Sequence, residues 1–401
     1  MIKIIKLNSL LILVVLISGF ILEVQAQDSA NSGINSTYTN SDGSKFVPKS
    51  YYPKFSWETT PLYFMFQDKN RVLSPEEVRF IADRTDFLCI EKSHALTTLG
   101  AAELGAKHEA REFKKIKPYA KVLFYFNSAY AWPYTSYNKN FTKDSINSHP
   151  ELKKFLIINP KTGELAQHFG AYCFDVLNPD FRDWWVETVA KGVKDSGCDG
   201  VFIDQMHGNV SLRKEKRFEI EKAMGEMMAN LKSKLGTEKI LLGNNANRND
   251  AKFVYPVCDA LMFENYSGAS FSKENLLNEW KEMLRNAKEG KISVFRLGVD
   301  GIGRKNRLPK TQKIRLSKEK LEFALACYLI GAQPYSYFMY SWGWLLSTGP
   351  LVEYPELQKP LGEPQGAYNR TSLDSWEFTR EFEHASVWVN TETRKAKITW
   401  H

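Results

Sequence analysis

Two stretches of this sequence share one pattern, and each of them ends on a carboxylate. Residues 198–204 read Cys-Asp-Gly-Val-Phe-Ile-Asp, and residues 258–264 read Cys-Asp-Ala-Leu-Met-Phe-Glu. A short apolar run that follows a turn is typical of a strand buried on both faces. Asp204 and Glu264 therefore close two predicted strands, at the end where parallel barrels carry their chemistry. We expect them to face each other across one barrel mouth, whereas Asp199 and Asp259 begin the strands at the opposite, stabilising end.

Glycosyl transfer requires a pair of carboxylates at one site, such as these two would form at one barrel mouth. One carboxylate attacks or screens an oxocarbenium-like centre, and the other protonates the departing oxygen. A separation of about 5–5.5 Å implies retention of configuration, and about 6.5–9.5 Å implies inversion. The structural alternative is that one or both of these carboxylates form ion pairs at the barrel mouth, with Lys92 or Arg296 as partner.

Further polar and aromatic side chains follow the predicted strands and fit a sugar pocket. Amides donate and accept hydrogen bonds, as sugar hydroxyls demand, and aromatic faces suit the C–H surface of a sugar ring. The predicted substrate-binding set is Glu91, Lys92, Asn127, Tyr130, Trp132, Gln205, Asn244, Asn245, Asn265, Arg296, Tyr340 and Trp342. Each member has a structural alternative as a turn, cap or core residue. Asp175 and His207 either support this pocket or stabilise a loop.

Eight apolar runs can place these side chains around one axis. The predicted strands are residues 62–66, 87–90, 122–126, 201–203, 240–243, 259–263, 292–295 and 335–340. Helical patterns occupy most of the gaps, so the fold class is α/β, a (β/α)8 TIM barrel over residues 51–348. Residues 128–180 interrupt this alternation of strand and helix patterns, which predicts a long functional loop. Alternation from Trp376 onward predicts a small C-terminal β appendage within residues 349–401.

The N-terminus has the features of a signal peptide over residues 1–26. Lys3 and Lys6 precede an apolar run at 10–22, and cleavage is expected after Ala26. Residues 27–50 are rich in Ser, Asn and Gly and predict a flexible leader. We saw no second run long enough to span a bilayer, so the sequence predicts an exported protein, periplasmic or secreted, with no stable membrane insertion after cleavage.

Composition and absent motifs narrow the function classes. Hydrophobic residues make up 43% and charged residues 25% of the chain, which is typical of a globular protein. The net charge of +8 comes from basic residues spread along the chain, so we expect no nucleic-acid partner, with a basic cleft for an acidic polysaccharide as the alternative. The five cysteines are widely spaced, which favours buried thiols and leaves one disulfide open. Motifs for a dinucleotide, a serine nucleophile or an amidohydrolase metal are missing, so no cofactor and no metal are expected.

Three stretches resemble a known family. They are Phe181-Arg182-Asp183-Trp184-Trp185, residues 199–204, and the tail from Arg380 to Asn390. Together they look like the TIM-barrel glycosidases of hypothetical glycosyl hydrolase family 15, with a similarity that extends from about Pro61 to the end. The resemblance to retaining α-glycosidases implies that Asp204 is the nucleophile and Glu264 the acid/base, and that the substrate is α-linked.

The sequence therefore predicts an exported glycoside hydrolase that acts on a polysaccharide or oligosaccharide. Two other functions remain open at this point. The first is a carbohydrate-binding barrel without catalysis, and the second is a glycan transferase or cyclase that uses the same two carboxylates.

Overall fold

The computed structural model describes residues 37–248, 251–265, 272–302 and 307–401. The predicted signal peptide, its cleavage site and the first ten residues of the predicted leader lie outside the described residues. Within the described ranges, none of the helices has the length and apolar character needed to cross a bilayer.

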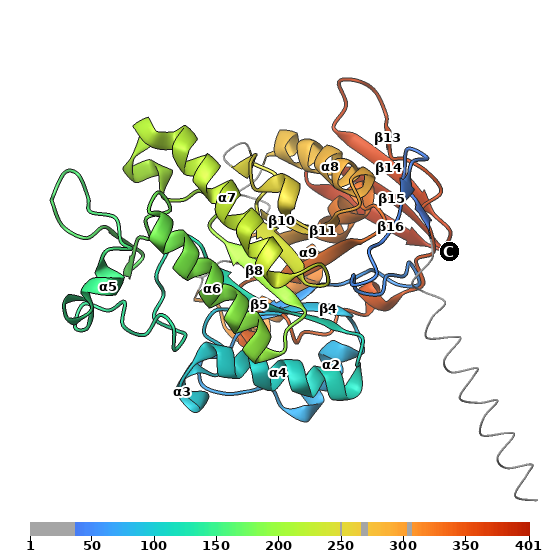
Figure 1. The fold of residues 1–401 in the computed structure, drawn as a ribbon. Helices are drawn as coiled ribbons and strands as arrows, with labels where there is room; N and C mark the ends of the chain where they lie inside the picture. The colour runs from blue at the N-terminus through green and yellow to red at the C-terminus, as the bar shows by residue number, and fades with distance from the viewer. Residues whose placement is uncertain (1–36, 249–250, 266–271, 303–306) are drawn as a thin grey trace, which may run out of the picture.

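Eight parallel strands form the centre of the molecule, in the order expected for a barrel (Figure 1). They are β3 (Phe64–Phe66), β4 (Phe87–Ile90), β5 (Lys121–Asn127), β8 (Gly200–Asp204), β9 (Ile240–Asn244), β10 (Ala260–Asn265), β11 (Ile292–Gly298) and β12 (Ser336–Ser341). A parallel bridge between Leu62 and Phe338 joins the first strand to the last. The predicted (β/α)8 TIM barrel is confirmed.

Helices connect most of these strands and cover the outside of the barrel. They are α2 (Pro75–Ala82), α3 (Leu96–Leu99), α4 (Ala102–Ile116), α6 (Pro179–Ser196), α7 (Arg217–Leu235), α8 (Lys273–Lys288) and α9 (Lys310–Gly331). Ser74 and Glu77 form a reciprocal capping box at the start of α2. The helical segment between β4 and β5 is divided into α3 and α4 at Gly100, whose φ of 84° ends the short first helix.

The repeated Cys-Asp pattern has a structural explanation at the amino ends of the strands. The Asp199 carboxylate accepts a hydrogen bond from the backbone N–H of Val122 and pairs with Lys114 of α4. The Asp259 carboxylate does the same with the N–H of Leu241 and with Lys232 of α7. Each aspartate thus ties a neighbouring strand and a helix together, far from the barrel mouth.

The connection from β5 to α6 is the insertion predicted at residues 128–180. It contains short elements at η1 (Ile146–Ser148), α5 (Pro150–Lys153), β6 (Gln167–His168) and β7 (Ala171–Tyr172). A small apolar cluster of its own includes Ala129, Ile157 and Cys173. Figure 1 shows α5 reaching out from the barrel on the side away from the C-terminal strands.

The C-terminal residues form a separate four-stranded antiparallel sheet, as the alternation predicted. Its strands are β13 (Asn369–Arg370), β14 (Glu377–Phe382), β15 (Ala385–Asn390) and β16 (Lys395–Trp400). Phe378, Val387 and Val389 belong to the same apolar core as Trp280 of α8 and Leu325 of α9. The boundary at residue 349 stays a prediction, because the sheet and the barrel share this core.

The prediction of a flexible leader is wrong for residues 38–46. Strands β1 (Tyr38–Thr39) and β2 (Lys45–Phe46) form an antiparallel hairpin instead. Phe46 is fully buried, and its ring stacks on Tyr335 with centroids 4.7 Å apart. The polar composition of the segment concealed this outcome, because only its few aromatic side chains, such as Tyr38 and Phe46, pack against Tyr335.

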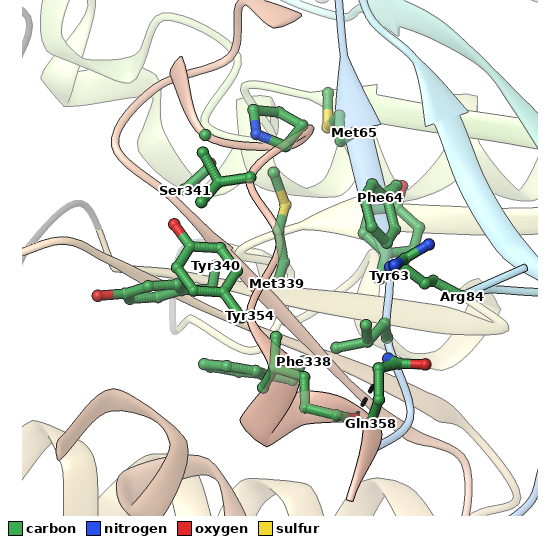
Figure 2. Close-up of a pocket in the computed structure, with 15 residues that line it drawn as sticks. Tyr63, Phe64, Met65, Arg84, Phe338, Met339, Tyr340, Ser341, Tyr354 and Gln358 are labelled. Carbon is green, nitrogen blue, oxygen red and sulfur yellow. Dashed lines mark hydrogen bonds between the residues drawn. The ribbon is translucent and has the colours of Figure 1, made fainter. Parts of the chain in front are cut away.

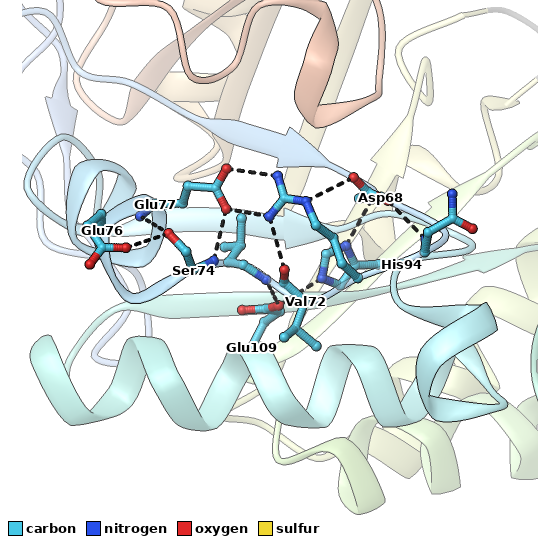
Figure 3. Close-up of polar contacts among 10 residues, drawn as sticks. Asp68, Val72, Ser74, Glu76, Glu77, His94 and Glu109 are labelled. Carbon is cyan, nitrogen blue, oxygen red and sulfur yellow. Dashed lines mark hydrogen bonds and ion pairs between the residues drawn. The ribbon is translucent and has the colours of Figure 1, made fainter.

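A buried polar network anchors the loop between β3 and α2 (Figure 3). His94 Nδ1 accepts a hydrogen bond from the backbone N–H of Asp68, so its Nε2 carries the proton that bridges to Glu109 Oε1 at 2.8 Å. The same Glu109 oxygen accepts from the N–H of Leu73. Since the N–H of His94 also donates to the carbonyl of Glu91, this network steadies the end of β4 at the mouth.

The five cysteines, Cys89, Cys173, Cys198, Cys258 and Cys327, are all free and buried. The expectation of buried thiols is confirmed, and the one disulfide that the sequence left open is not formed.

Candidate active site

Asp204 ends β8 on the inner face of the barrel, where four donors fix its carboxylate. Oδ2 accepts hydrogen bonds from the Tyr125 hydroxyl at 2.7 Å and from Asn127 Nδ2 at 3.4 Å. Oδ1 accepts from the backbone N–H of Gln205 and from Asn244 Nδ2, both at 2.9 Å. Hydrogen bonds to an ionised carboxylate are strong, so this side chain is held in one orientation.

The start of β8 explains the glycine of the same motif. A Cβ on Gly200 would lie 2.1 Å from the carbonyl oxygen of Ile240 on β9. A side chain at this position would clash with the backbone of β9, so only glycine fits here.

Asn244, on the strand between β8 and β10, bridges the two carboxylates. Its Nδ2 donates to Asp204 Oδ1 at 2.9 Å and to Glu264 Oε2 at 2.8 Å. Because both distances end on one nitrogen, the two carboxylate oxygens lie no more than about 5.7 Å apart, near the range for retaining glycosidases. The carboxylates are thus two strands apart around the mouth, closer than residues that face each other across it.

Glu264 is held chiefly through one of its two oxygens. Asn245 Nδ2 lies 3.5 Å from the same Oε2, and Asn245 Oδ1 accepts the backbone N–H of Glu264. Among the residues that the structure describes, Oε1 of Glu264 is the oxygen left to meet a substrate. No lysine or arginine in the described ranges lies within salt-bridge distance of Asp204 or Glu264, so the simple ion-pair alternative is not realised.

The chain turns sharply just after β8 and β9. Gln205 has a φ of 65° and Asn245 a φ of 53°, in the left-handed region that few residues other than glycine adopt. Such strain is common at active sites, where it aims side chains. The Gln205 side chain turns to His207, with Oε1 and Nε2 2.7 Å apart, while Asp175 pairs with Arg213 and so stabilises the insertion.

An ion pair lies at the end of β4, between the buried Glu91 and the partly exposed Lys92. The Lys92 ammonium pairs with Glu91 Oε1 and lies 5.0 Å above the Tyr125 ring. Burial raises the pKa of Glu91, although Lys92 opposes the effect. Burial lowers the pKa of Lys92, but the charges of Glu91, Asp204 and Glu264 outweigh it and leave a net increase. The ammonium therefore pairs with Glu91 and also feels the charges of the two strand-end carboxylates.

Arg296 reaches the mouth from β11, where it is the direct neighbour of Glu264 in the strand register. Its Nη1 donates to the carbonyl of Asn265, and its guanidinium lies 4.3 Å above the Trp344 ring. The insertion adds Tyr130, whose N–H donates to Asn127 Oδ1. Burial and the nearby Asp204 charge raise the pKa of Tyr130 to about 12.

The structure turns three of the predicted substrate-binding side chains away from the mouth. Asn265 donates to Glu279 of α8 at 2.8 Å. Tyr340 donates to the carbonyl of Ser317 in α9, and Trp342 is buried beneath Gly349. Neighbouring strand residues point to opposite faces, so Asn265 cannot share the inner face with Glu264.

Figure 2 shows the surroundings of Tyr340, which lies beside Tyr354 in a pocket outside the barrel wall. Mostly apolar residues of β3, β12 and the segment 349–358 line this pocket. Neither Asp204 nor Glu264 lines it, so we do not regard it as the active site.

Sequence reasoning missed two aromatic residues that the fold brings to the site. Tyr125 donates directly to Asp204, and Trp344 stacks on Arg296. Tyr125 could have been found, because it lies two residues before Asn127 and must share its face. Trp344 follows the last strand in a loop, where alternation gives no guidance.

The other predicted residues lie at or near the mouth: Glu91, Lys92, Asn127, Tyr130, Trp132, Gln205, Asn244, Asn245 and Arg296. Their part in substrate binding stays a prediction. In the described ranges, no group of three or more His, Cys, Asp or Glu side chains could hold a metal ion. Chemically, two carboxylates held by a shared amide can supply one nucleophile and one proton donor.

Comparison with protein families gives one match, to hypothetical glycosyl hydrolase family 15 over residues 114–386. This range includes the ends of β5, β8, β9, β10 and β11. The search of curated proteins gave no match.

Three solved structures illustrate the similarity of fold. Amy13B of Eubacterium rectale has a TM-score of 0.50 at 12% identity, over 85% of this chain and 88% of its own. The α-amylase of Geobacillus thermoleovorans complexed with acarbose has a TM-score of 0.48 at 13% identity, over 83% and 86%. The glycoside hydrolase domain of PelA from Pseudomonas aeruginosa has 0.43 at 14% identity, over 68% and 90%. At these identities, the similarity to Amy13B supports the barrel fold alone.

Proposed function

Because the chain belongs to hypothetical glycosyl hydrolase family 15 and is a glycoside hydrolase, we propose that it cleaves α-linked glycans with retention of configuration. Asp204 is the nucleophile and Glu264 the general acid and base. The observation that carries this proposal is the bridge through Asn244 Nδ2, which holds the two carboxylates close together. The α linkage rests on the resemblance of the strand-end motifs to those of retaining α-glycosidases.

The proposed reaction takes two steps. Asp204 attacks the anomeric carbon while Glu264 gives its proton to the departing glycosidic oxygen, which forms a covalent glycosyl-enzyme. Water then attacks this ester, and Glu264 takes a proton from the water as the bond to Asp204 breaks. The Tyr125 hydroxyl and the amides around Asp204 orient the nucleophile before the attack.

The surrounding residues support a carbohydrate substrate. Lys92 and Glu91 offer donors and an acceptor at the rim, and Oε2 of Glu91 is buried without a hydrogen-bond partner among the described residues. A sugar hydroxyl can satisfy this oxygen when the substrate binds. We also propose that the protein is exported, from the signal-like residues 1–26.

We expect Asp204→Asn and Glu264→Gln each to lower kcat on aryl α-glycosides by about 10³-fold or more, because each removes a reacting group. Asp199→Asn is the matched control, since it changes a carboxylate at the opposite end of β8 that pairs with Lys114. Far-UV circular dichroism should show that all three variants fold. Wild-type activity in either site variant would contradict the assignment.

The stereochemical claim has its own test. NMR of the first product from an aryl α-glycoside should show the α-anomer, and a 2-deoxy-2-fluoro glycoside should leave a sugar bound to the peptide that contains Asp204. A β-anomer as first product would show inversion and overturn the proposed mechanism.

A further inference from the structure

The hairpin β6–β7 in the insertion exposes an aromatic side chain at its tip. Its two strands pair Gln167 with Tyr172 and His168 with Ala171, which leaves Phe169 and Gly170 as a two-residue turn. Both turn residues have positive φ, 51° and 81°. This turn normally uses Asn-Gly, because a bulky side chain is strained in the left-handed region. Phe169 is nevertheless 73% exposed, so neither folding preference nor core packing explains this residue.

The exposed ring is the outer end of a continuous row of aromatic side chains. The Phe169 ring centroid lies 3.9 Å from that of His168 and 6.1 Å from that of Tyr130, and His168 stacks on Tyr130 at 5.5 Å. Trp132 lies 6.4 Å from Tyr130. We call Tyr130, Trp132, His168 and Phe169 the aromatic ledge.

The ledge is connected to the catalytic carboxylate at its inner end. The backbone N–H of Tyr130 donates to Asn127 Oδ1, and Asn127 Nδ2 donates to Asp204 Oδ2. The ledge thus begins next to the nucleophile and ends in solvent. Tyr130 is buried at the inner end, Trp132 is partly exposed, and His168 and Phe169 are exposed, so the ledge presents apolar ring surface toward its outer end.

We propose that the aromatic ledge is a substrate-binding subsite that stacks on hexose rings of an α-linked polymer beyond the bond that is cleaved. This inference rests on the proposed function for the identity of the polymer. The electron-rich ring faces attract the polarised C–H groups of a sugar, while the hydroxyl groups of that sugar remain in water. The continuity of the ledge with Asp204 favours a sugar chain over a protein partner, because one bound chain can occupy both places.

The variant Phe169→Asn tests the ledge without disturbing its backbone, because asparagine tolerates positive φ. Phe169→Trp keeps an aromatic face and should bind as the wild type does. Tyr119→Ala is the matched control, since Tyr119 is 42% exposed and precedes β5 at the opposite end of the barrel, beneath Lys54.

Affinity electrophoresis in gels that contain amylose, dextran or polygalacturonate measures binding directly. At least one polymer should retard the wild type, and Phe169→Asn should weaken that retardation by about tenfold, the loss of one aromatic contact. Phe169→Trp and Tyr119→Ala should keep it. Phe169→Asn should lower hydrolysis of the polymer more than hydrolysis of a single-sugar aryl α-glycoside, since the small substrate does not reach the ledge.

Unchanged retardation of Phe169→Asn, or a wild type that none of the three polymers retards, would overturn the subsite. Equal loss of activity on the aryl glycoside and on the polymer would also overturn it, because it would indicate general damage to the site. Retardation that depends on Phe169 together with full activity of Asp204→Asn would leave the ledge standing and refute the catalytic assignment. The two proposals can therefore fail separately.

Discussion

At the scale of single residues, the amide of Asn244 decides what the two carboxylates can do together. Its two N–H groups point to different acids, so one side chain sets both the distance between them and their orientation. Repulsion between two carboxylates at this separation is reduced when a shared donor lies between them. The Tyr125 hydroxyl and the Asn127 amide complete the support on the Asp204 side.

We expect Asn244→Ala to lower kcat/KM by about 10²-fold while the protein remains folded, because both carboxylates lose a preorganising donor. Steady-state kinetics on an aryl α-glycoside, with a thermal melt as the folding check, measure this effect. Activity close to that of the wild type would mean that Asn244 does not position the pair.

At the scale of elements, α8 and β10 meet through a carboxyl group that the proposed mechanism does not use. Glu279 of α8 accepts a hydrogen bond from Asn265, the residue after Glu264. Burial raises the pKa of Glu279 to about 7, although Asn265 and the charge of Arg248 oppose the shift. The contact between this helix and the strand that carries Glu264 is therefore sensitive to pH.

This shift predicts a pH-dependent stability. The folded state binds the Glu279 proton more tightly than the unfolded state does. Protonation of Glu279 therefore stabilises the folded state fully below about pH 4.5, and this stabilisation is lost as the pH rises through about 7. Glu279→Gln should remove that loss. As the pH rises from 5 to 8, the free energy of unfolding of the variant should therefore increase by about 1–2 kcal/mol relative to that of the wild type. The gain is smaller than the full shift would imply because the Glu279 side chain is partly exposed to solvent.

Urea unfolding at several pH values measures the difference between the two proteins. Glu282→Gln serves as the control on the same helix, since Glu282 pairs with Arg285 at the surface. Parallel stability profiles for the wild type and Glu279→Gln would contradict the prediction.

At the scale of the whole molecule, one buried arginine fastens the C-terminal sheet to the barrel. Arg380 of β14 donates to the carbonyls of Leu329 and Ile330 at the end of α9, and its Nε donates to the carbonyl of Gly366. These carbonyls carry the negative end of the helix dipole, which suits a cation. Burial lowers the pKa of Arg380 to about 10, so the side chain stays charged at neutral pH.

Arg380→Met should destabilise the folded protein by about 3–5 kcal/mol, because it leaves several buried carbonyls without a donor. Arg370→Met is the matched control on the neighbouring strand, where the guanidinium is partly exposed and binds the carbonyl of Ser375. We expect that variant to lose less than about 1 kcal/mol. Denaturant unfolding compares the two variants. Equal losses in the free energy of unfolding would show that Arg380 does not hold the C-terminal sheet to the barrel.

The sequence by itself determined the barrel, the insertion, the C-terminal sheet and the end of the barrel at which Asp204 and Glu264 lie. These features depend on local rules: apolar runs and helical periods alternate along the chain, and parallel strands all end on one side. The carboxylate that closes each strand could therefore be placed before any contact was known.

Only the tertiary structure decided which side chains enter the site. A strand that is buried on both faces appears in the sequence as a continuous apolar run. The sequence therefore does not show which of its residues face the barrel axis. Asn244 therefore lies inside and Asn265 outside, although each is the last residue of its strand. Phe169 and Tyr130 meet because the insertion folds back on itself, a long-range contact that no local pattern encodes.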